Sequence, residues 1–384
     1  MPRLLIDGTA LSTTPKGVGR YSHQLVEQLL QRLCHNWSIN IVVFGDDLPE
    51  FKQASNLSVI RIPRLPELVK GLIGIPLLTI QIRADVVLLP MEVIALAVGR
   101  PILAVLHDID ALIAFAGRQP VKVPSRMINW VKQHFRIRML RHACIVICNS
   151  NFTAEAAVTS YGLKRNKILV GYCGIDERFY CSNDAHVRDW CGAVKNWQGY
   201  VLTFATEDPR ERYDLCPAIW EHVHAELPEV GLIVAGIRCE RDYVVELRNK
   251  FSARGLAGGR DYAFVDFIGE SEFARLRSLY RDADFYLELS GHEGFGMQLA
   301  EAMATGTTCS SSGRGALSEV GSVYALDFGE LEPMHIATKI IQAYKDQLHL
   351  RDNRAQVEYT RRYSWNSVGA LVARKLIELQ KDIE

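Results

Sequence analysis

The first half of the chain alternates short apolar runs with longer stretches of helical periodicity. Leu4 to Ile6 is an apolar run, and beyond Val18 the apolar residues recur three and four positions apart, as they do on one face of a helix. Strands that alternate with helices are typical of a doubly wound parallel α/β sheet, in which ligands bind at the carboxyl ends of the strands. The sequence predicts a helix that buries Leu25, Val26, Leu29, Leu30 and Leu33, and strands at 4–6, 39–44, 85–89, 102–106 and 145–148.

The same alternation starts again near residue 199, which predicts a second Rossmann-like sheet. The two parts are separated by a polar, tryptophan-containing segment with little periodicity, as expected for a linker. We therefore expect an N-terminal domain over 1–178, a linker over 179–198, a C-terminal domain over 199–362 and a helical segment over 363–384. Strands of the second domain are predicted at 200–204, 231–235, 263–268, 284–289 and 307–310.

Residues 290–306 combine a glycine-rich loop with a short helix. Gly294 and Gly296 flank Phe295 directly after Glu293, and free N–H groups at the start of a helix favour a phosphate. The same pattern also fits a partly buried helix whose polar stripe faces water, with the glycines as turn residues. The helix is apolar except for Gln298, Glu301 and Thr305, whose spacing of three and four places them on one face.

The spacing of Glu293 and Glu301 resembles the Glu-x7-Glu element of retaining nucleotide-sugar glycosyltransferases, the GT4 group of the GT-B fold. The resemblance implies two Rossmann-like doubly wound domains that face a cleft, with the 363–384 helix crossing back to pack on the first domain. It also implies that Glu293 lies against the donor sugar and that Glu301 binds the ribose hydroxyls of the nucleotide. The loop residues Gly294, Phe295 and Gly296 are then donor-binding residues as well.

Two segments of the first domain extend the resemblance. Gly17 and Gly19 resemble the N-terminal glycine loop of the family, which approaches the donor phosphate and the acceptor. His107 and Asp108 follow a predicted strand and resemble a His-Asp pair at the cleft, which implies that His107 contacts the donor sugar near the reacting carbon. A lone histidine after a strand is more often structural, but the surrounding pattern favours a site role. Ser150 and the stretches 161–162, 174–176 and 318–321 match the family too.

One departure from the family pattern concerns the donor diphosphate. Glu211 stands where the family usually has a lysine that neutralises the phosphates. A carboxylate facing a desolvated diphosphate would be unfavourable by several kcal/mol. Arg210 and Arg212 flank it and are the expected replacement cations, on the assumption that alternate side chains of this segment point the same way. A second departure is Thr307 in place of the usual proline.

Composition is that of an ordinary globular protein. The 384 residues carry no net charge, 48% are hydrophobic and 23% are charged, and no apolar run approaches the roughly 18 residues of a membrane helix. Nine cysteines without a Cys-x-x-Cys pair indicate a reducing cytoplasm. Residues 1–180 hold 21 Lys and Arg against 13 Asp and Glu, whereas the remainder holds 23 against 31. The basic half would suit anionic lipid or a phosphorylated acceptor, and two neutralising faces of a cleft are an equal alternative.

The segment from Arg61 to Arg83 strings apolar residues among basic ones, with Glu67 as its one acidic residue. Such a mixture suits an interfacial segment that contacts a membrane or a lipid-linked acceptor. A buried β–α connection is an equally good interpretation, and the prolines argue against one continuous helix. These prolines are Pro63, Pro66 and Pro76.

Together these features predict a retaining glycosyltransferase that moves a hexose from a GDP- or UDP-linked sugar to a glycan or lipid-linked acceptor in cell-surface polysaccharide synthesis. The resemblance implies that cations and helix N-termini, rather than a metal, stabilise the departing diphosphate, so no metal or other cofactor is expected, and no nucleic-acid partner is expected. The alternative is a catalytically silent relative that binds a glycan or an enzyme, which Glu211 motivates. An epimerase of the same fold is disfavoured because its histidine and glutamate pattern is not evident.

Overall fold

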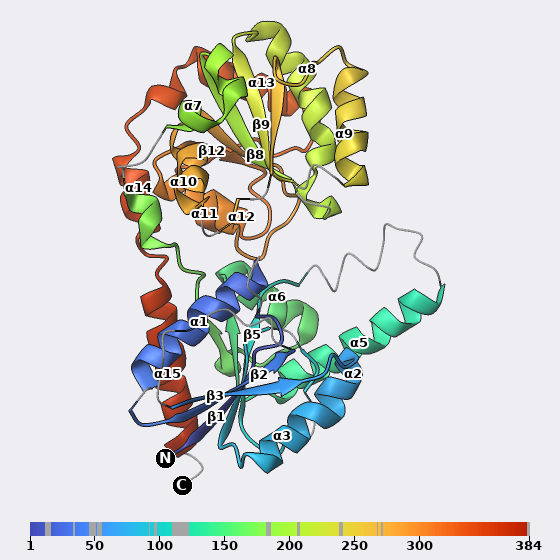
Figure 1. Cartoon of the computed structure of the whole chain (residues 1–384), viewed down its shortest axis with the longest axis vertical. Coiled ribbons are helices and arrows are strands. Elements are labelled where there is room, and N and C mark those ends of the chain that lie inside the picture. Colours follow the sequence, from blue (N-terminus) through green and yellow to red (C-terminus); the bar gives the residue numbers. More distant parts are fainter. Residues whose placement is uncertain are drawn as a thin grey trace. The chain divides into compact units, whose positions relative to one another are not determined.

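The protein divides into two compact units (Figure 1), described separately below. Unit 1 comprises Met1–Gly174 and Tyr363–Glu384, and unit 2 comprises Ile175–Arg362. The computed structural model describes residues 1–11, 17–33, 35–45, 51, 56–91, 93–95, 98–109, 123–181, 186–205, 208–237, 241–266, 268–269 and 272–381, without the side chains of 123–129, 209 and 237.

Unit 1 is built on a seven-stranded parallel sheet in the order β3-β2-β1-β4-β5-β6-β7. The inner strands are buried on both faces, so they are continuous apolar runs rather than alternating ones. The chain builds outward from β1 in one direction and then from β4 in the other, which is the doubly wound arrangement expected from the sequence. The strands are β1 (Arg3–Asp7), β2 (Ser38–Phe44), β3 (Leu57–Ile62), β4 (Val86–Leu89), β5 (Ile102–Leu106), β6 (Ile145–Cys148) and β7 (Ile168–Val170).

Helices cover both faces of this sheet. The amphipathic helix α1 buries the apolar stripe predicted from its periodicity. The last helix of the chain, α15, belongs to unit 1 and packs on α1, where Gly369 lies so close to Gln28 that a Cβ would be 2.5 Å from its side chain. This confirms the expected return of the C-terminal helix (Figure 1). The helices are α1 (Val18–Leu33), α2 (Glu67–Val69), η1 (Lys70–Gly74), α3 (Ile75–Gln81), α5 (Val123–His142), α6 (Asn151–Tyr161), η3 (Arg165–Lys167) and α15 (Trp365–Lys381).

The segment 61–83 is not one continuous helix, as its prolines indicated, because β3 ends at Ile62 and the helical part begins after Pro66. From Glu67 to Gln81 the chain is helical throughout, from α2 through the π-turn η1 to α3. Pro66 is the N-cap of α2, whereas Pro76 lies in the first turn of α3, directly after the π-turn. The wider π-turn, in which the N–H of Ile75 donates to the carbonyl of Lys70, admits the proline ring without a clash. None of the helices that the structure describes has the length and hydrophobicity of a membrane-spanning segment.

Unit 2 is built on a six-stranded parallel sheet in the order β10-β9-β8-β11-β12-β13. Its core gathers apolar side chains from the sheet and from α8, α9 and α13, with Trp220 fully buried among them. The strands are β8 (Gly199–Phe204), β9 (Val230–Ile237), β10 (Tyr262–Asp266), β11 (Phe285–Glu288), β12 (Thr308–Ser311) and β13 (Leu326–Asp327). The two sheets therefore confirm the predicted fold class.

The segment expected to be a linker, 179–198, lies in unit 2 and carries short helices. The α-helices of unit 2 are α7 (Val187–Trp190), α8 (Cys216–Glu226), α9 (Asp242–Ser252), α10 (Phe273–Arg281), α11 (Met297–Ala304), α12 (Leu317–Gly321), α13 (Pro333–Lys345) and α14 (Arg354–Thr360). Its short 3-10 helices are η4 (Glu177–Tyr180), η5 (Gly192–Asn196), η6 (Pro209–Glu211), η7 (Tyr213–Leu215) and η9 (Leu348–Leu350).

Candidate functional site

In unit 2 the strand order reverses between β8 and β11, which is where an open parallel sheet leaves a crevice for a ligand. The segment after β8 carries Arg210 and Arg212, and the loop after β11 carries Glu293. The two segments meet, because the N–H of Gly291 donates to the carbonyl of Arg210 at 2.8 Å. Residues that the sequence assigned to one site are thus brought together at the edge of the sheet where ligands bind.

The Glu293 loop is fixed by the loop that follows β12. The N–H of Ala316 donates to the carbonyl of Glu293 at 3.0 Å. Gly315 has a φ of +63°, and a Cβ there would lie 2.7 Å from the same carbonyl oxygen. Only glycine permits this approach, so the two loops are held against each other through their backbones. Glu293 itself is half-buried at this junction.

Gly296 ends the loop and begins α11. Its φ of +90° lies in the region that favours glycine, and a Cβ would lie 2.6 Å from the side chain of Leu317. Its carbonyl accepts from the N–H of Ala300, the first hydrogen bond of the helix. Gly294 and Phe295 are buried beside it. The glycine pattern therefore has a conformational cause, and it places the helix start at the carboxyl edge of the sheet.

Glu301 is buried in α11, with 4% of its surface exposed. Its Oε2 accepts a hydrogen bond at 3.2 Å from the hydroxyl of Tyr280, a fully buried residue of α10. The polar stripe predicted from the sequence therefore does not simply face water, since its central carboxyl is tied to the next helix. Gln298, one turn earlier on the same face, is half-buried.

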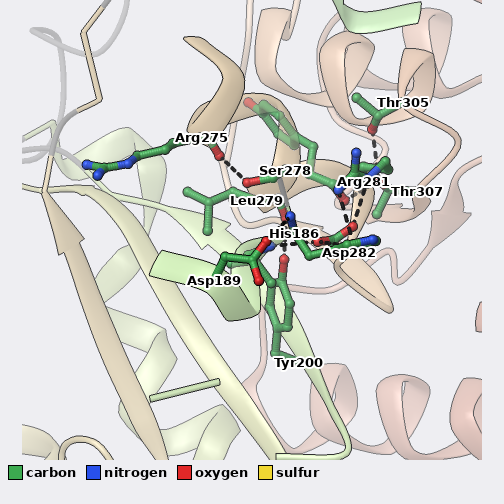
Figure 2. A network of polar contacts seen from close by, with 12 residues as sticks. His186, Asp189, Tyr200, Arg275, Ser278, Leu279, Arg281, Asp282, Thr305 and Thr307 are labelled. Atoms are coloured by element: carbon green, nitrogen blue, oxygen red, sulfur yellow. Dashed lines mark hydrogen bonds and ion pairs between the residues drawn. The ribbon is translucent and has the colours of Figure 1, made fainter. Parts of the chain in front are cut away.

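A polar network holds the carboxyl end of α10, from which Tyr280 reaches Glu301. Asp282 accepts hydrogen bonds from the Val187 N–H at 2.8 Å and from Arg281 Nε at 2.8 Å. Tyr200 donates from its hydroxyl to the carbonyl of Leu279 at 2.7 Å. Figure 2 shows these contacts converging from α7, β8 and α10. The network anchors the helix end and so fixes the position of Tyr280 relative to α11.

Thr307, the departure from the family proline, belongs to the same support. It is 3% exposed, and its hydroxyl donates to the carbonyl of Tyr280 at 2.5 Å (Figure 2). The hydroxyls of Thr305 and Thr307 are also hydrogen-bonded, at 2.9 Å. A proline could not make these bonds, so this chain uses a hydroxyl to fix the strand entry beside Tyr280.

The two arginines near Glu211 are arranged differently from the sequence expectation. Pro209–Glu211 is a 3-10 turn, and Arg212 follows it in the left-handed region with φ +50°. Alternate side chains do not point the same way in such a turn, so that assumption was wrong. Arg210 forms an ion pair with Asp208 at 2.8 Å, and Arg212 with Asp214 at 3.2 Å. Burial favours a higher pKa for Asp208, but the hydrogen bonds from Arg210 outweigh it and hold the pKa below its ordinary value.

Arg314 lies at the tip of the loop that contacts Glu293. It is exposed between Gly313 and Gly315, which both have positive φ. Within the part of the chain that the structure describes, no carboxylate forms an ion pair with Arg314. A third cation is therefore available beside the Glu293 loop.

Glu288 is a site residue that the sequence pattern did not reveal. It ends β11 at the strand reversal and is 5% exposed. Its carboxylate accepts from the Tyr286 hydroxyl at 2.8 Å and from the Ser290 N–H at 3.1 Å. Burial raises the pKa of the Glu288 carboxyl above its ordinary value, although these hydrogen bonds act to lower it. It holds the first turn of the loop that leads to Glu293, and it could have been found only as an acidic residue within an apolar strand.

In unit 1, His107 lies just beyond the end of β5 and is 6% exposed. Its Nε2 is 2.7 Å from the carbonyl of Pro90, to which it donates as the Nε2–H tautomer. The ring meets Tyr21 of α1 edge-on, with centroids 4.6 Å apart. Asn149 donates from its amide to the His107 carbonyl at 2.8 Å. His107 is therefore rigidly held where three strands end.

The glycine loop of unit 1 leads into α1. Gly17 has a φ of +44°, and its carbonyl accepts from the N–H of Tyr21 at 3.0 Å, so the loop turns directly into the helix. Gly19 is buried in the first turn. The loop residues 12–16 lie outside the described residues.

A buried ion pair sits where β1 ends. Lys70 Nζ is 2.9 Å from Asp7 Oδ2 and 2.6 Å from the Thr9 hydroxyl, and Asp7 is fully buried. The strand order of unit 1 reverses between β1 and β4, so this pair lies at the equivalent ligand-binding edge. This pair could not be predicted from the sequence pattern, because the two residues are 63 positions apart.

Comparison with protein-family models gives two matches. The model described as Glycosyltransferase Family 4 matches residues 15–179, and the one described as Glycosyl transferases group 1 matches residues 198–363. A phosphatidyl-myo-inositol mannosyltransferase from Mycobacterium tuberculosis is 34% identical over 187 residues, which is 46% of this chain and 47% of that protein. A mannosylfructose-phosphate synthase from Agrobacterium fabrum is 28% identical over 174 residues, 44% of this chain and 37% of that protein. The chain thus spans about half the length, or less, of these curated relatives.

Solved structures match nearly the whole chain in fold. HepE from Anabaena, in complex with UDP and glucose, has a TM-score of 0.72 at 19% identity, covering 98% of this chain and 99% of that one. A sucrose-phosphate synthase from Thermosynechococcus elongatus has a TM-score of 0.73 at 17% identity, covering 99% of each chain. With a glycosyltransferase model over each half and GT-B neighbours over nearly its full length, the chain belongs to the GT4-type glycosyltransferases.

Proposed function

We propose that the protein is a retaining hexosyltransferase that takes a hexose from a GDP- or UDP-linked sugar and passes it to a glycan or lipid-linked acceptor in cell-surface polysaccharide synthesis. The observation that carries the proposal is the arrangement in unit 2, where Glu293, the start of α11 and Glu301 lie at the strand reversal. Two relatives support the choice of substrates: the mycobacterial protein is named as a mannosyltransferase of phosphatidyl-myo-inositol, and HepE was solved with UDP and glucose.

In this proposal Glu301 binds the ribose hydroxyls and the Glu293 loop, with Gly294, Phe295 and Gly296, holds the sugar and the diphosphate. A carboxylate that accepts from two hydroxyls makes charge-assisted hydrogen bonds, which are stronger than neutral ones. The N–H groups at the start of α11 and the helix dipole favour the anionic diphosphate.

The reaction needs positive charge where the diphosphate departs. Arg210 and Arg212 already neutralise Asp208 and Asp214, so each brings little net charge to the donor. Arg314 has no such partner within the described residues and lies on the loop bonded to Glu293. It supplies the cation, while the backbone carbonyl of Arg210 holds the Glu293 loop by accepting from the N–H of Gly291.

The chemical step breaks the bond between the anomeric carbon of the sugar and the diphosphate oxygen. The acceptor oxygen bonds to the same carbon from the face that the diphosphate leaves, and the hydroxyl proton of the acceptor passes to the departing diphosphate. No side chain acts as nucleophile. His107 and the glycine loop with Gly17 and Gly19 act on the sugar and the acceptor, and the rigid setting of His107 suits a group that must meet developing charge.

The ion pairs of Arg210 and Arg212, together with Glu211, favour one alternative: a silent relative that binds glycan without transfer. Incubation of the purified chain with labelled GDP- and UDP-hexoses and with lipid-linked and oligosaccharide acceptors separates the two. Transfer with the sugar anomer retained, as seen by NMR of the product, is the expected result. Glycan binding without release of nucleotide from any donor would establish the silent relative instead.

A further inference from the structure

A stripe of exposed apolar side chains runs along the helical segment 67–81 of unit 1. Apart from the neighbours Leu72 and Ile73, successive members are three or four residues apart, so they occupy one face of the segment. Isolated apolar residues on a surface are ordinary, whereas a continuous stripe marks a surface that something covers. The members and their exposed fractions are Val69 (40%), Leu72 (37%), Ile73 (55%), Leu77 (59%) and Ile80 (71%).

The opposite face of the same segment is locked to unit 1. Lys70 is buried in its ion pair with Asp7, and Ile75 and Thr79 are buried beside it. Gly71 lies against the backbone of Ile94, where a Cβ would be 1.7 Å from the carbonyl oxygen. Rotation of the helix to bury the stripe would break a buried ion pair and this backbone contact. The contacts of the opposite face therefore keep the stripe on the outer surface of unit 1.

Among the described residues, exposed arginines border the stripe at both ends. Arg64 precedes the helical segment, and Arg83 follows it. Glu67, the acidic residue of the segment, is already paired with Lys132 and Arg136 of α5 at 3.5 and 2.7 Å. Anionic lipid headgroups complement such a border, and the apolar face suits the boundary with the acyl chains.

We propose that this stripe is a membrane-docking surface, with the helix lying in the plane of an anionic bilayer and the arginines on the headgroups. The biological role of this docking rests on the proposed function, since a docked enzyme would reach a lipid-linked acceptor in the membrane. Docking itself requires no donor and no catalysis, so it is measured independently.

The test is flotation of the full chain with vesicles of phosphatidylcholine, with and without phosphatidylglycerol, at low and high salt. The double variant Leu77→Ser/Ile80→Ser removes the two most exposed members of the stripe. Its matched control is Val323→Ser/Leu350→Ser, which changes side chains that are 85% and 71% exposed on unit 2. Melting curves establish that both variants fold.

The wild type and the control should float with anionic vesicles and lose binding at high salt. The Leu77→Ser/Ile80→Ser variant should bind at least about tenfold more weakly, the change expected for each apolar side chain withdrawn from the interface. Equal flotation of wild type and stripe variant overturns the proposal, as does a wild type that ignores vesicles but forms a dimer that the stripe variant cannot form. Loss of donor binding by the wild type with flotation intact would instead refute the proposed function alone.

Discussion

Glu301 has two roles that a matched pair of substitutions separates. In the structure it accepts from the buried hydroxyl of Tyr280, and in the proposed function it also binds the ribose. Glu301→Ala removes both, and Glu301→Gln keeps an oxygen acceptor for Tyr280 while losing the charge. Without the acceptor, a buried hydroxyl costs about 1–3 kcal/mol of folding free energy. For a unit of this size that corresponds to a fall in melting temperature of roughly 2–12 °C.

The loss of donor affinity follows from the ribose bonds. Hydrogen bonds to a charged group are worth about 1.5–3 kcal/mol, so Glu301→Ala should weaken donor binding roughly 10- to 150-fold. Glu301→Gln replaces charged bonds by neutral ones and should weaken it by about 1 kcal/mol, or roughly fivefold, with a melting temperature near that of the wild type. Calorimetric titration and thermal melting measure the two effects on the same samples.

Tyr280→Phe is the control, because it removes the hydroxyl and leaves the carboxylate. It should lower the melting temperature with a smaller loss of donor affinity than Glu301→Ala. If Glu301→Ala and Glu301→Gln both bind donor as the wild type does, Glu301 serves only to hold Tyr280, and the ribose assignment is wrong.

His107→Ala should lower turnover far more than donor affinity, because the contact of His107 matters most as charge develops in the transition state. If steady-state kinetics show that turnover and donor affinity fall equally, His107 is a binding residue only. Arg314→Gln should raise the donor KM more than Arg210→Gln or Arg212→Gln, since those two already have carboxylate partners, and an unchanged KM for Arg314→Gln would return the role to the other pair. The raised pKa of Glu288 means that the folded chain holds the proton more tightly than the unfolded chain. As pH rises from about 4.5, the ordinary pKa of a glutamate, through the raised pKa, the wild type should therefore lose stability relative to Glu288→Gln. Urea-denaturation midpoints measured between pH 4 and 8 test this. A constant difference between the midpoints of the two proteins over that range would contradict it.

Periodicity predicted the architecture because the sheets are parallel and buried. Each inner strand is a continuous apolar run, which is a strong signal even in a single sequence. The strands that it missed lie at sheet edges: β3 (Leu57–Ile62) is only partly buried, β7 (Ile168–Val170) has three residues and β13 (Leu326–Asp327) has two. β7 and β13 have too few residues to show a period, and in β3 Ser58 and Arg61 interrupt the apolar run that marks the inner strands.

Those features of the site that depend on residues close together in the sequence could be predicted from it. Gly296 needs its positive φ, and the pairs Asp208–Arg210 and Arg212–Asp214 could have been foreseen, since each joins residues two positions apart. The bond between Tyr280 and Glu301 could not, because it depends on how α10 packs on α11. Packing also decides which side of 67–81 faces inward, and apolar residues lie on both sides of that segment.

The most direct test of the central claim is a calorimetric titration of the full chain with GDP-, UDP- and ADP-hexoses, with Glu301→Gln measured alongside. The account predicts that a GDP- or UDP-linked sugar binds and that Glu301→Gln binds the same donor about fivefold more weakly at unchanged stability. A wild-type chain that is folded yet binds none of these donors would contradict it.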